Sequence, residues 1–317
     1  MVKIKSNGKE LETGDELLEL VGPRTEVKTI SLERRTLACV WYLSNQETFR
    51  SIVDRFGLSK GSLHYFLRKF CNIITSNEIL QQLIRWPSSD SEFQNISENF
   101  TQRAGFPNVI GALDGTYIPI LGPTAFRESY ICRKGFPALH LQAVCDTDLK
   151  FLDVFCAYPG SVHDSRVFKN SPLYTELQNN PVPRQYHLLG DSAYGNSETV
   201  LVPFRDNGHL NADEKRYNNA HSSTRVDIER SFGLLKGKFR RLRYVEMKRV
   251  EDIPSLVVTC CGLHNFIIQR ERYTDEDIDM DAADGDGPPG TCSVARDTGA
   301  VDKSGHEKRL QVMHSLQ

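Results

Sequence analysis

The chain has 317 residues, of which 39% are apolar and 25% are charged, and its formal net charge is −2. This length accommodates two modest domains or one large one, with a buried core. It contains no run of about 18 apolar residues and does not begin with the charged-then-apolar layout of a secretory signal, so we expect neither a transmembrane helix nor secretion. The eight cysteines include no CxxC pair, which argues against a zinc finger and favours buried thiols in a reducing compartment.

The small net charge hides two segments of opposite sign. Residues 225–249 hold nine Lys or Arg and three acids, a net charge of +6, whereas residues 271–317 hold five Lys or Arg and 11 acids, a net charge of −6. A basic segment in a balanced body indicates an anionic partner, with a solvated helix face as the alternative. Residues 273–317 combine many acids and glycines with few apolar residues, which predicts an acidic, disordered tail.

The first third of the chain has the pattern of helices. We expect residues 1–30 to form an N-terminal arm and residues 31–105 to form a helical region, with three helices between residues 31 and 75. Gly57 and a Ser59 cap separate the second of these helices from the third. This layout predicts a helix-turn-helix that binds DNA, while a three-helix bundle used only for packing is the alternative. The polar residues on its last helix are Lys60, His64, Arg68 and Lys69.

Between residues 106 and 272 the pattern becomes that of an α/β domain. Strand-like runs are "NVIGALDGTYIPI", "LHLQAVCDTD", "FLDVFCAYPG" and "YHLLGDSAY". A helix beginning at "SVHDSRVF" lies between the last two of these strands, and a long amphipathic helix, "TRVDIERSFGLLKGKFRRLRY", follows. Three strands, a helix, a fourth strand and further helices predict a mixed sheet with flanking helices.

Three acids stand where this pattern can bring them together. Asp114 lies inside the first strand, where an ionised carboxylate is costly unless it is paired. Asp191 directly follows the fourth strand, and side chains at such strand ends converge on one edge of a sheet. Glu229 lies about 100° from the apolar stripe of the long helix, at the border of the core, with Lys236 and Arg240 further along the same flank. For each acid alone, the alternative is a structural salt bridge or a cap.

Held close together, three carboxylates repel one another unless a cation neutralises them. Oxygen ligands without Cys or His favour Mg²⁺ or Mn²⁺. Two such ions suit in-line displacement at phosphorus, because one activates a water or hydroxyl and the other stabilises the leaving oxygen. The acids therefore predict a divalent-metal site for phosphodiester chemistry.

A set of motifs in this order resembles the PIF/Harbinger-type DDE transposase family, which includes a transposase-derived vertebrate nuclease. The motifs are "GALDGTYIPI", "YICRKGFPALHLQAVCD", "YPGSVHDSRVF", "LLGDSAYGNSETVLVPF", "RYNNAHSSTRVDIERSFGLLKGKFRRL" and "CCGLHNFII", and the resemblance covers residues 30–270. It implies an RNase H-like catalytic core over residues 106–272 that acts on DNA in the nucleus with a divalent metal. The catalytic triad that it implies is Asp114, Asp191 and Glu229.

The second metal ligand has a competing candidate. "PGSVHDSRVF" places Asp164 in the first turn of a helix, where it could cap that helix or ligate the metal, and His163 beside it is a further candidate. Topology favours Asp191, because an RNase H-like core has its second Asp just after the fourth strand, so Asp164 is kept as an accessory metal ligand. Arg133 and Lys134 in "CRKG" are expected to contact phosphate, with a loop salt bridge as the alternative.

We therefore expect a metal-dependent DNA nuclease or transposase, or a domesticated derivative. The alternative is a catalytically silent DNA-binding protein derived from a transposase. A small-molecule phosphohydrolase would fit the acids but would leave the helical region and the basic helix unexplained. Related transposases often use a separate Myb/SANT-like DNA-binding protein for end binding and nuclear entry, so such a partner and a homo-oligomer are further expectations. We expect the protein in the nucleus, with the cytoplasm as a second location, and no association with membranes.

Overall fold

The computed structural model describes residues 10–22, 30–271, 273, 278 and 302–316. Its first part is helical: α1 (Glu10–Val21), α2 (Leu32–Ser44), α3 (Phe49–Phe56), α4 (Lys60–Ile74), α5 (Asn77–Leu83) and α6 (Asp90–Ala104). The three helices predicted between residues 31 and 75 are therefore present. α3 ends at Gly57, whose φ of 55° is left-handed, a conformation that glycine adopts without strain. Ser59 Oγ accepts a hydrogen bond from the backbone N–H of Ser62 at 3.0 Å, which caps α4 as predicted.

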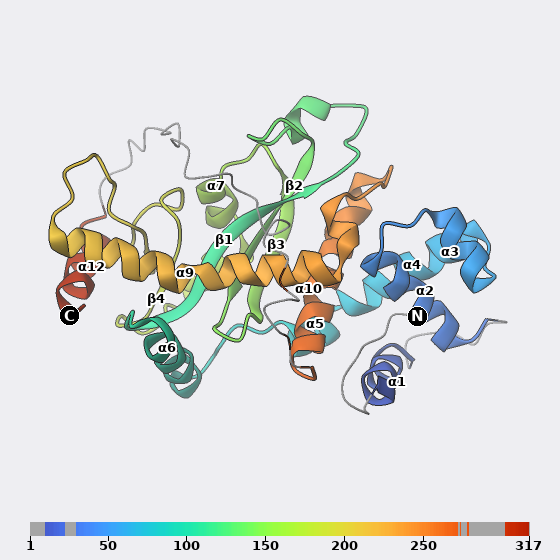
Figure 1. Cartoon of the computed structure of the whole chain (residues 1–317), viewed down its shortest axis with the longest axis horizontal. Helices are drawn as coiled ribbons and strands as arrows, with labels where there is room; N and C mark the ends of the chain where they lie inside the picture. The colour runs from blue at the N-terminus through green and yellow to red at the C-terminus, as the bar shows by residue number, and fades with distance from the viewer. Residues whose placement is uncertain (1–9, 23–29, 272, 274–277, 279–301, 317) are drawn as a thin grey trace.

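A mixed five-stranded sheet forms the centre of the molecule (Figure 1). Its strands stand in the order β3-β2-β1-β4-β5, with β1 (Val109–Pro119), β2 (Ala138–Cys145), β3 (Phe151–Pro159), β4 (His187–Leu189) and β5 (Val200–Leu201). β2 is antiparallel to β1 and β3, whereas β4 is parallel to β1 and β5. The four predicted strands are present. β5 was not predicted, because two residues are too few to show a period.

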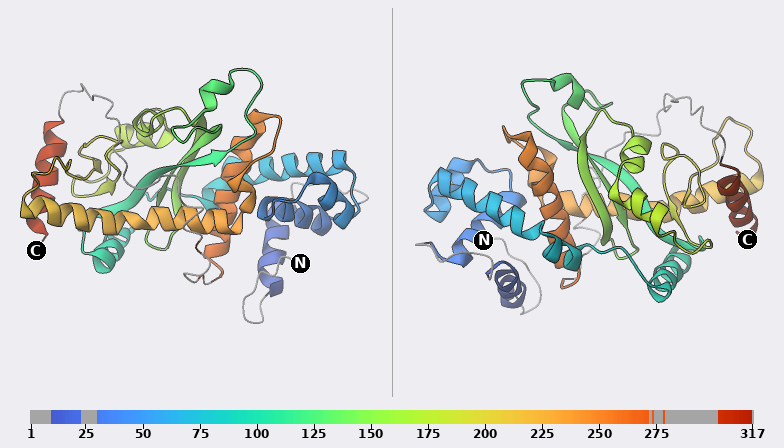
Figure 2. Two further views of the ribbon diagram at one scale, coloured as in Figure 1. Left: turned by 45° about the horizontal axis from the view of Figure 1, so that its top comes forward. Right: turned by 180° about the vertical axis from the view of Figure 1, so that it is seen from behind.

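Helices cover both faces of this sheet (Figure 2). One face packs against α9 (Ala212–Lys238) and α10 (Ile253–Ile268), which are joined through the 3₁₀ turns η3 (Arg240–Arg243) and η4 (Val250–Asp252). The other face packs against α7 (Asp164–Lys169) and α8 (Pro172–Asn179). The single helix predicted after β3 is thus two helices, because Ser171 Oγ accepts from the Tyr174 N–H at 3.1 Å and begins α8. A further 3₁₀ turn, η2 (Arg127–Tyr130), lies between β1 and β2.

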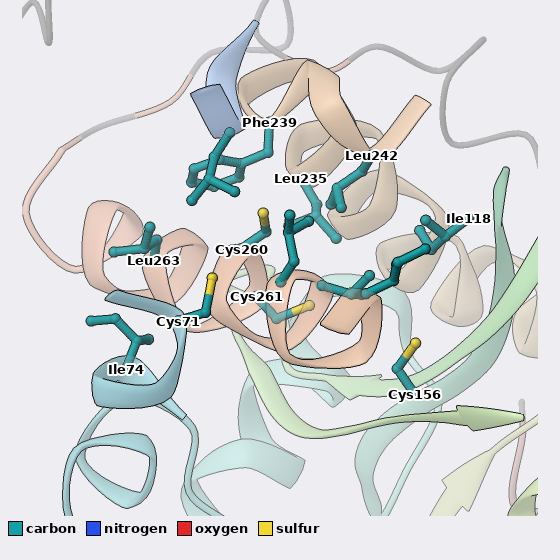
Figure 3. Packing of buried hydrophobic residues seen from close by; sticks show 14 of the residues in the cluster. Cys71, Ile74, Ile118, Cys156, Leu235, Phe239, Leu242, Cys260, Cys261 and Leu263 are labelled. Carbon is teal, nitrogen blue, oxygen red and sulfur yellow. The ribbon is translucent and has the colours of Figure 1, made fainter. Parts of the chain in front are cut away.

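The helical region and the sheet share one hydrophobic core. Figure 3 shows side chains of α4, α9, α10 and the sheet in a single packed cluster. Asn265 of α10 joins the two parts, because its Nδ2 donates to the carbonyls of Leu83 at 2.9 Å and Phe151 at 2.7 Å, and its Oδ1 accepts from the Phe151 N–H at 2.8 Å. The seven cysteines among the described residues are buried and free, as expected. α10 therefore fixes the helical region against the sheet.

The end of the chain differs from the sequence prediction. The acidic, disordered tail was expected over residues 273–317, but residues 303–315 form α12 (Lys303–Ser315), which is docked beside α9 and β5. Val312 and Met313 of this helix and Leu316, directly after it, are buried in a cluster with β5 and α9. The prediction failed there because it averaged over the whole tail. The few apolar residues that dock α12 are outweighed in that average by the many acids and glycines. The remainder of that tail lies almost wholly outside the described residues. In the part of the chain that the structure describes, no helix has the length and apolarity to cross a membrane.

Candidate active site

Asp114 lies in β1 just beyond the point where the short strand β4 ends. Alternate residues of a strand share a face, and Thr116, on the same face as Asp114, accepts a hydrogen bond from Lys236 of α9. Asp114 therefore faces α9. Its partner there is Arg225, whose Nη1 lies 2.5 Å from Asp114 Oδ2 while its Nη2 lies 2.6 Å from Glu229 Oε1. One guanidinium thus bridges two of the predicted catalytic acids.

Asp191 approaches the same place from the end of β4. Its Oδ1 accepts a hydrogen bond from the Ala193 N–H at 2.9 Å, which holds the side chain at the start of the β4–β5 segment. Its charge acts on Asp114 and on Arg225. Among the charges that raise the pKa of Arg225 against the effect of its burial are those of Asp114, Glu229 and Asp191. The three acids of the predicted triad therefore surround a single cation.

Asp164 comes from the opposite face of β1 and has a different partner. His140 Nε2 of β2 lies 3.0 Å from Asp164 Oδ1 at the start of α7. A Cβ built on Gly115 would lie 2.2 Å from His140 Nε2 and 2.7 Å from Asp164 Oδ1, so only glycine admits both side chains this close to the strand. The absence of a side chain at Gly115 therefore lets Asp164 lie close to β1, where its charge acts on Asp114. Asp164 lies in the first turn of α7, as predicted, and the N-cap residue is His163, whose side chain makes no capping hydrogen bond.

The pKa values of these acids show that they lie within range of one another's charge. Burial raises the pKa of Asp114 to about 7; Arg225 opposes the shift, and the charges of Asp191 and Asp164 add to it. Burial and the charge of Asp164 likewise raise the pKa of Asp191. Burial alone would raise the pKa of Asp164, but the hydrogen bond and charge of His140, with the charge of Arg133, hold it below its ordinary value. Asp164 is thus compensated by its own partners, whereas Asp114 and Asp191 are not fully compensated.

Two further polar side chains belong to this region. The Tyr194 hydroxyl is buried and has no hydrogen-bond partner among the described residues, and burial together with the charges of all three aspartates raises the pKa of Tyr194 well above its ordinary value. Gln142, opposite Gly115 in the sheet, is fully buried with neither amide atom hydrogen-bonded in the described part of the chain. Unpaired buried polar atoms are costly. Both side chains therefore carry hydrogen-bonding groups that the described residues leave unsatisfied beside the acids.

The donor chemistry fits a hard divalent cation, because the acids supply only carboxylate oxygens. Over the described residues, however, no group of three or more His, Cys, Asp or Glu side chains is arranged to hold a metal ion. Arg225 instead pairs with Asp114 and Glu229. A metal at this site would have to share these two carboxylates with the guanidinium.

The residues predicted to bind DNA fall into two groups. Exposed or partly exposed side chains are those of Lys60, His64, Arg68, Lys69, Arg133, Lys134 and Arg240. Of these, Arg68 lies 3.7 Å from Asp252, and the His64 ring stacks on Phe49 with centroids 4.2 Å apart.

Lys236 was predicted wrongly as a phosphate contact. Only 4% of its surface is exposed, and its Nζ donates to Thr116 Oγ1 at 2.7 Å and to the Tyr117 carbonyl at 3.2 Å. Arg241 in the same basic segment is also buried, with Nη2 donating to the Glu47 carbonyl at 2.6 Å. Part of the basic segment therefore ties α9 and η3 to the fold and does not face a partner.

Sequence reasoning missed Arg225, His140 and Tyr194. A signal existed for Arg225, because an Arg four residues before Glu229 on a helix is placed to pair with it. His140 and Tyr194 carry no such local signal. They meet the acids only through strand pairing and through packing of the β4–β5 segment.

A mixed sheet with acids gathered at the end of β4, beside the middle of β1, is compatible with the core of a DDE nuclease. Residues 113–265 match the family described as "DDE superfamily endonuclease". Together with the relatives below, this match fits a DDE transposase-related family.

The relatives include animal proteins named as nucleases and a plant protein. The chain is 29% identical over 264 residues to the rat protein named "Putative nuclease HARBI1" and 28% identical over 264 residues to the human protein of that name, covering 80% of this chain and 74% of each relative. It is 28% identical to the Arabidopsis thaliana "Protein ALP1-like", over 78% of this chain and 63% of that protein. No solved structure matches the chain.

Proposed function

We propose that this chain is a divalent-metal-dependent DNA nuclease, a transposase or a domesticated derivative, with an RNase H-like core. The observation that carries the proposal is the gathering of Asp114, Asp191 and Glu229 around Arg225, in a family described as endonucleases. Asp114, Asp191 and Glu229 would hold the metal, with Asp164 as an accessory ligand. When bound, two such ions supply an activated water and stabilisation of the leaving oxygen at phosphorus.

The side chains of this protein would organise that chemistry. Arg225 holds the Asp114 and Glu229 carboxylates in one orientation, which limits the rearrangement needed when a substrate arrives. His140 fixes Asp164 at the surface of β1. The burial of Asp114 keeps bulk water away from the reacting region, where electrostatic interactions are then stronger.

Binding of DNA would involve a second surface. α3 and α4 are arranged as two capped helices joined at Gly57 and Ser59, which supports the proposed helix-turn-helix, and α4 carries Lys60, Arg68 and Lys69. Arg133 lies within range of the acids, since its charge acts on Asp164 and Asp191, and Lys134 follows it in the chain. On this proposal the protein acts on DNA in the nucleus, with a Myb/SANT-like protein as a candidate partner.

A catalytically silent DNA-binding protein is the second candidate. It is favoured by two observations: Arg225 already pairs with Asp114 and Glu229, and no three acidic or other ligating side chains of the described residues form a metal-holding group. Such a protein would keep the fold and the basic surface without the reaction.

Cleavage of DNA separates the two candidates. The substrate is a duplex carrying a candidate terminal repeat, incubated with and without Mg²⁺ or Mn²⁺. The nuclease proposal predicts metal-dependent cutting that falls by at least about 100-fold in Asp114→Asn. Asp148→Asn is the matched control, because the Asp148 side chain is 65% exposed on the β2–β3 turn. Binding of the duplex without metal-dependent cutting by the wild type would favour the silent protein.

A further inference from the structure

α12 docks against the segment of chain that carries Asp191. Figures 1 and 2 show it beside the first half of α9, at the end of the molecule opposite α2, α3 and α4. Asp191 belongs to the irregular segment between β4 and β5, and β5 has only two residues. Within the segment the hydrogen bonds are local, such as those from the Tyr194 N–H to the Asp191 carbonyl at 3.2 Å and from the Ser197 N–H to the Val200 carbonyl at 2.8 Å. Contacts from outside the sheet add to them in holding the segment that carries Asp191.

Lys308 of α12 joins the two ends of this segment. Its Nζ donates to the carbonyl of Tyr186, just before β4, at 2.7 Å and to the carbonyl of Glu198, just before β5, also at 2.7 Å. These carbonyls belong to residues 12 positions apart, and Asp191 lies between them. One ammonium group thus links the chain just before β4 to the chain just before β5.

Gly305 brings α12 into direct contact with the same segment. A Cβ at this position would lie 2.6 Å from the Ser197 Cα, 2.5 Å from its carbonyl carbon and 3.0 Å from the Glu198 nitrogen. These are backbone atoms, which cannot rotate away as a side chain can. Only glycine permits this approach, so the helix and the segment fit each other at backbone level.

Arg309 extends the contact past β5. Its Nη1 donates to the carbonyls of Val202 at 3.4 Å and Pro203 at 3.3 Å, and its guanidinium lies 4.1 Å from the centre of the Phe204 ring. Val312 and Met313 are buried beneath it. α12 therefore contacts the chain on both sides of β5, while the Asp191 carboxylate lies at the other end of the segment.

We propose that α12 is a positioning element for the active site: through Lys308 and Gly305 it braces the β4–β5 segment and so fixes Asp191 near Asp114 in the middle of β1. The effect of this brace on metal binding rests on the proposed function, in which Asp191 is a metal ligand. The brace itself is a statement about residues 191–202 and can be measured without metal. Supports behind a ligand typically change metal affinity by about 10- to 100-fold when they are removed.

Amide hydrogen exchange of the full chain tests the brace directly. We expect Lys308→Met and Gly305→Val to speed exchange in residues 191–202 by at least about 10-fold, and to leave the amides of α4 unchanged. Lys303→Met is the matched control, because Lys303 is exposed on the same helix. Titration of the same proteins with Mn²⁺, followed by calorimetry, should show at least about 10-fold weaker binding for Lys308→Met and Gly305→Val.

The outcomes separate this inference from the proposed function. Unchanged exchange in residues 191–202 in both variants, or the same acceleration in Lys303→Met, would overturn the brace. Faster exchange in α4 as well would show general destabilisation and would also overturn it. If the wild type binds no Mn²⁺ while the exchange result holds, the proposed metal site fails and the brace stands.

Discussion

At the scale of single residues, Arg225 decides the electrostatics of the site. A carboxylate as buried as Asp114 is costly without a partner, and the guanidinium supplies one for Asp114 and Glu229 at once. Breaking a largely buried pair by removing one member leaves an uncompensated charge. Arg225 therefore stabilises the metal-free protein. A divalent cation bound to the same carboxylates would compensate part of their charge in its place.

Replacing Arg225 tests this exchange of cations. We expect Arg225→Met to lower the free energy of unfolding of the metal-free protein by about 3 kcal/mol, and to enlarge the rise in melting temperature that Mn²⁺ produces. Arg216→Met is the matched control on α9, since the Arg216 side chain is 46% exposed and pairs with Asp213 at the surface; it should change stability by less than about 1 kcal/mol. Thermal melts with and without Mn²⁺ give both quantities. Equal effects of the two substitutions would remove Arg225 from the site.

Gly115 provides a second test at this scale. Because a Cβ would overlap His140 Nε2 and Asp164 Oδ1, we expect Gly115→Ala to displace both side chains and to reduce the metal-dependent rise in melting temperature. Gly61→Ala in α4 is the control, because the nearest atom to a Cβ there is Ser59 Oγ at 3.9 Å. NMR shifts of the His140 ring report the displacement. An unmoved ring and an unchanged metal response in Gly115→Ala would contradict the close approach described here.

At the scale of elements, the three helices between residues 31 and 75, α9 and the longer strands were predictable, whereas α1, β5 and α12 were not. β1 to β4 and α9 show apolar periods, and caps such as Ser59 mark helix starts. The pairing of Arg225 with Glu229 follows from helix spacing, but its contact with Asp114 joins residues 111 positions apart and depends on the sheet order. β5 and α12 are held by neighbouring elements and have no strong pattern of their own. The buried Lys236 shows the same limit, since charge alone does not reveal which side of a helix faces the core.

α4 carries the prediction for DNA binding. Replacing Arg68 and Lys69 with Ala should weaken DNA binding and make the slope of log affinity against log salt shallower by about one for each phosphate that is no longer neutralised. Metal affinity should stay the same, since neither residue lies among the acids. Fluorescence anisotropy with a labelled duplex over a range of NaCl concentrations measures the slope. Because Arg68 also pairs with Asp252, its replacement removes an ion pair within the protein as well as a DNA contact. Lys69→Ala is therefore measured separately. An unchanged affinity and slope in the double variant would reduce α4 to a packing helix.

At the scale of the whole molecule, α10 unites the helical region and the sheet, and its buried His264 links stability to pH. His264 Nε2 lies 2.8 Å from the Leu149 carbonyl oxygen, and burial lowers the pKa of His264 to about 4 although this hydrogen bond opposes the shift. A histidine is ordinarily protonated below about pH 6.5 in the unfolded chain. The unfolded state therefore binds more protons between these values, and stability present above pH 6.5 is lost as the pH falls toward 4.

Denaturant melts at several pH values test this linkage. We expect His264 to account for a loss of up to about 3 kcal/mol in the free energy of unfolding as the pH falls below 6.5. His264→Gln should show a smaller loss over the same range, whatever its stability at pH 7. His209→Gln, at an exposed position, should keep the pH dependence of the wild type. The same steep loss in His264→Gln would assign the acid sensitivity to other groups.

The central claim is that Asp114, Asp191 and Glu229 share a divalent cation and that Asp164, already paired with His140, is accessory. The most direct measurement is the rise in melting temperature on adding saturating Mn²⁺, compared among the wild type, Asp191→Ala and Asp164→Ala. We predict a rise in the wild type, its complete loss in Asp191→Ala and at most a partial loss in Asp164→Ala, because ligand removal eliminates binding to the folded state. A complete loss in Asp164→Ala with an unchanged rise in Asp191→Ala would contradict this assignment, and the absence of any rise in the wild type would contradict the metal site itself.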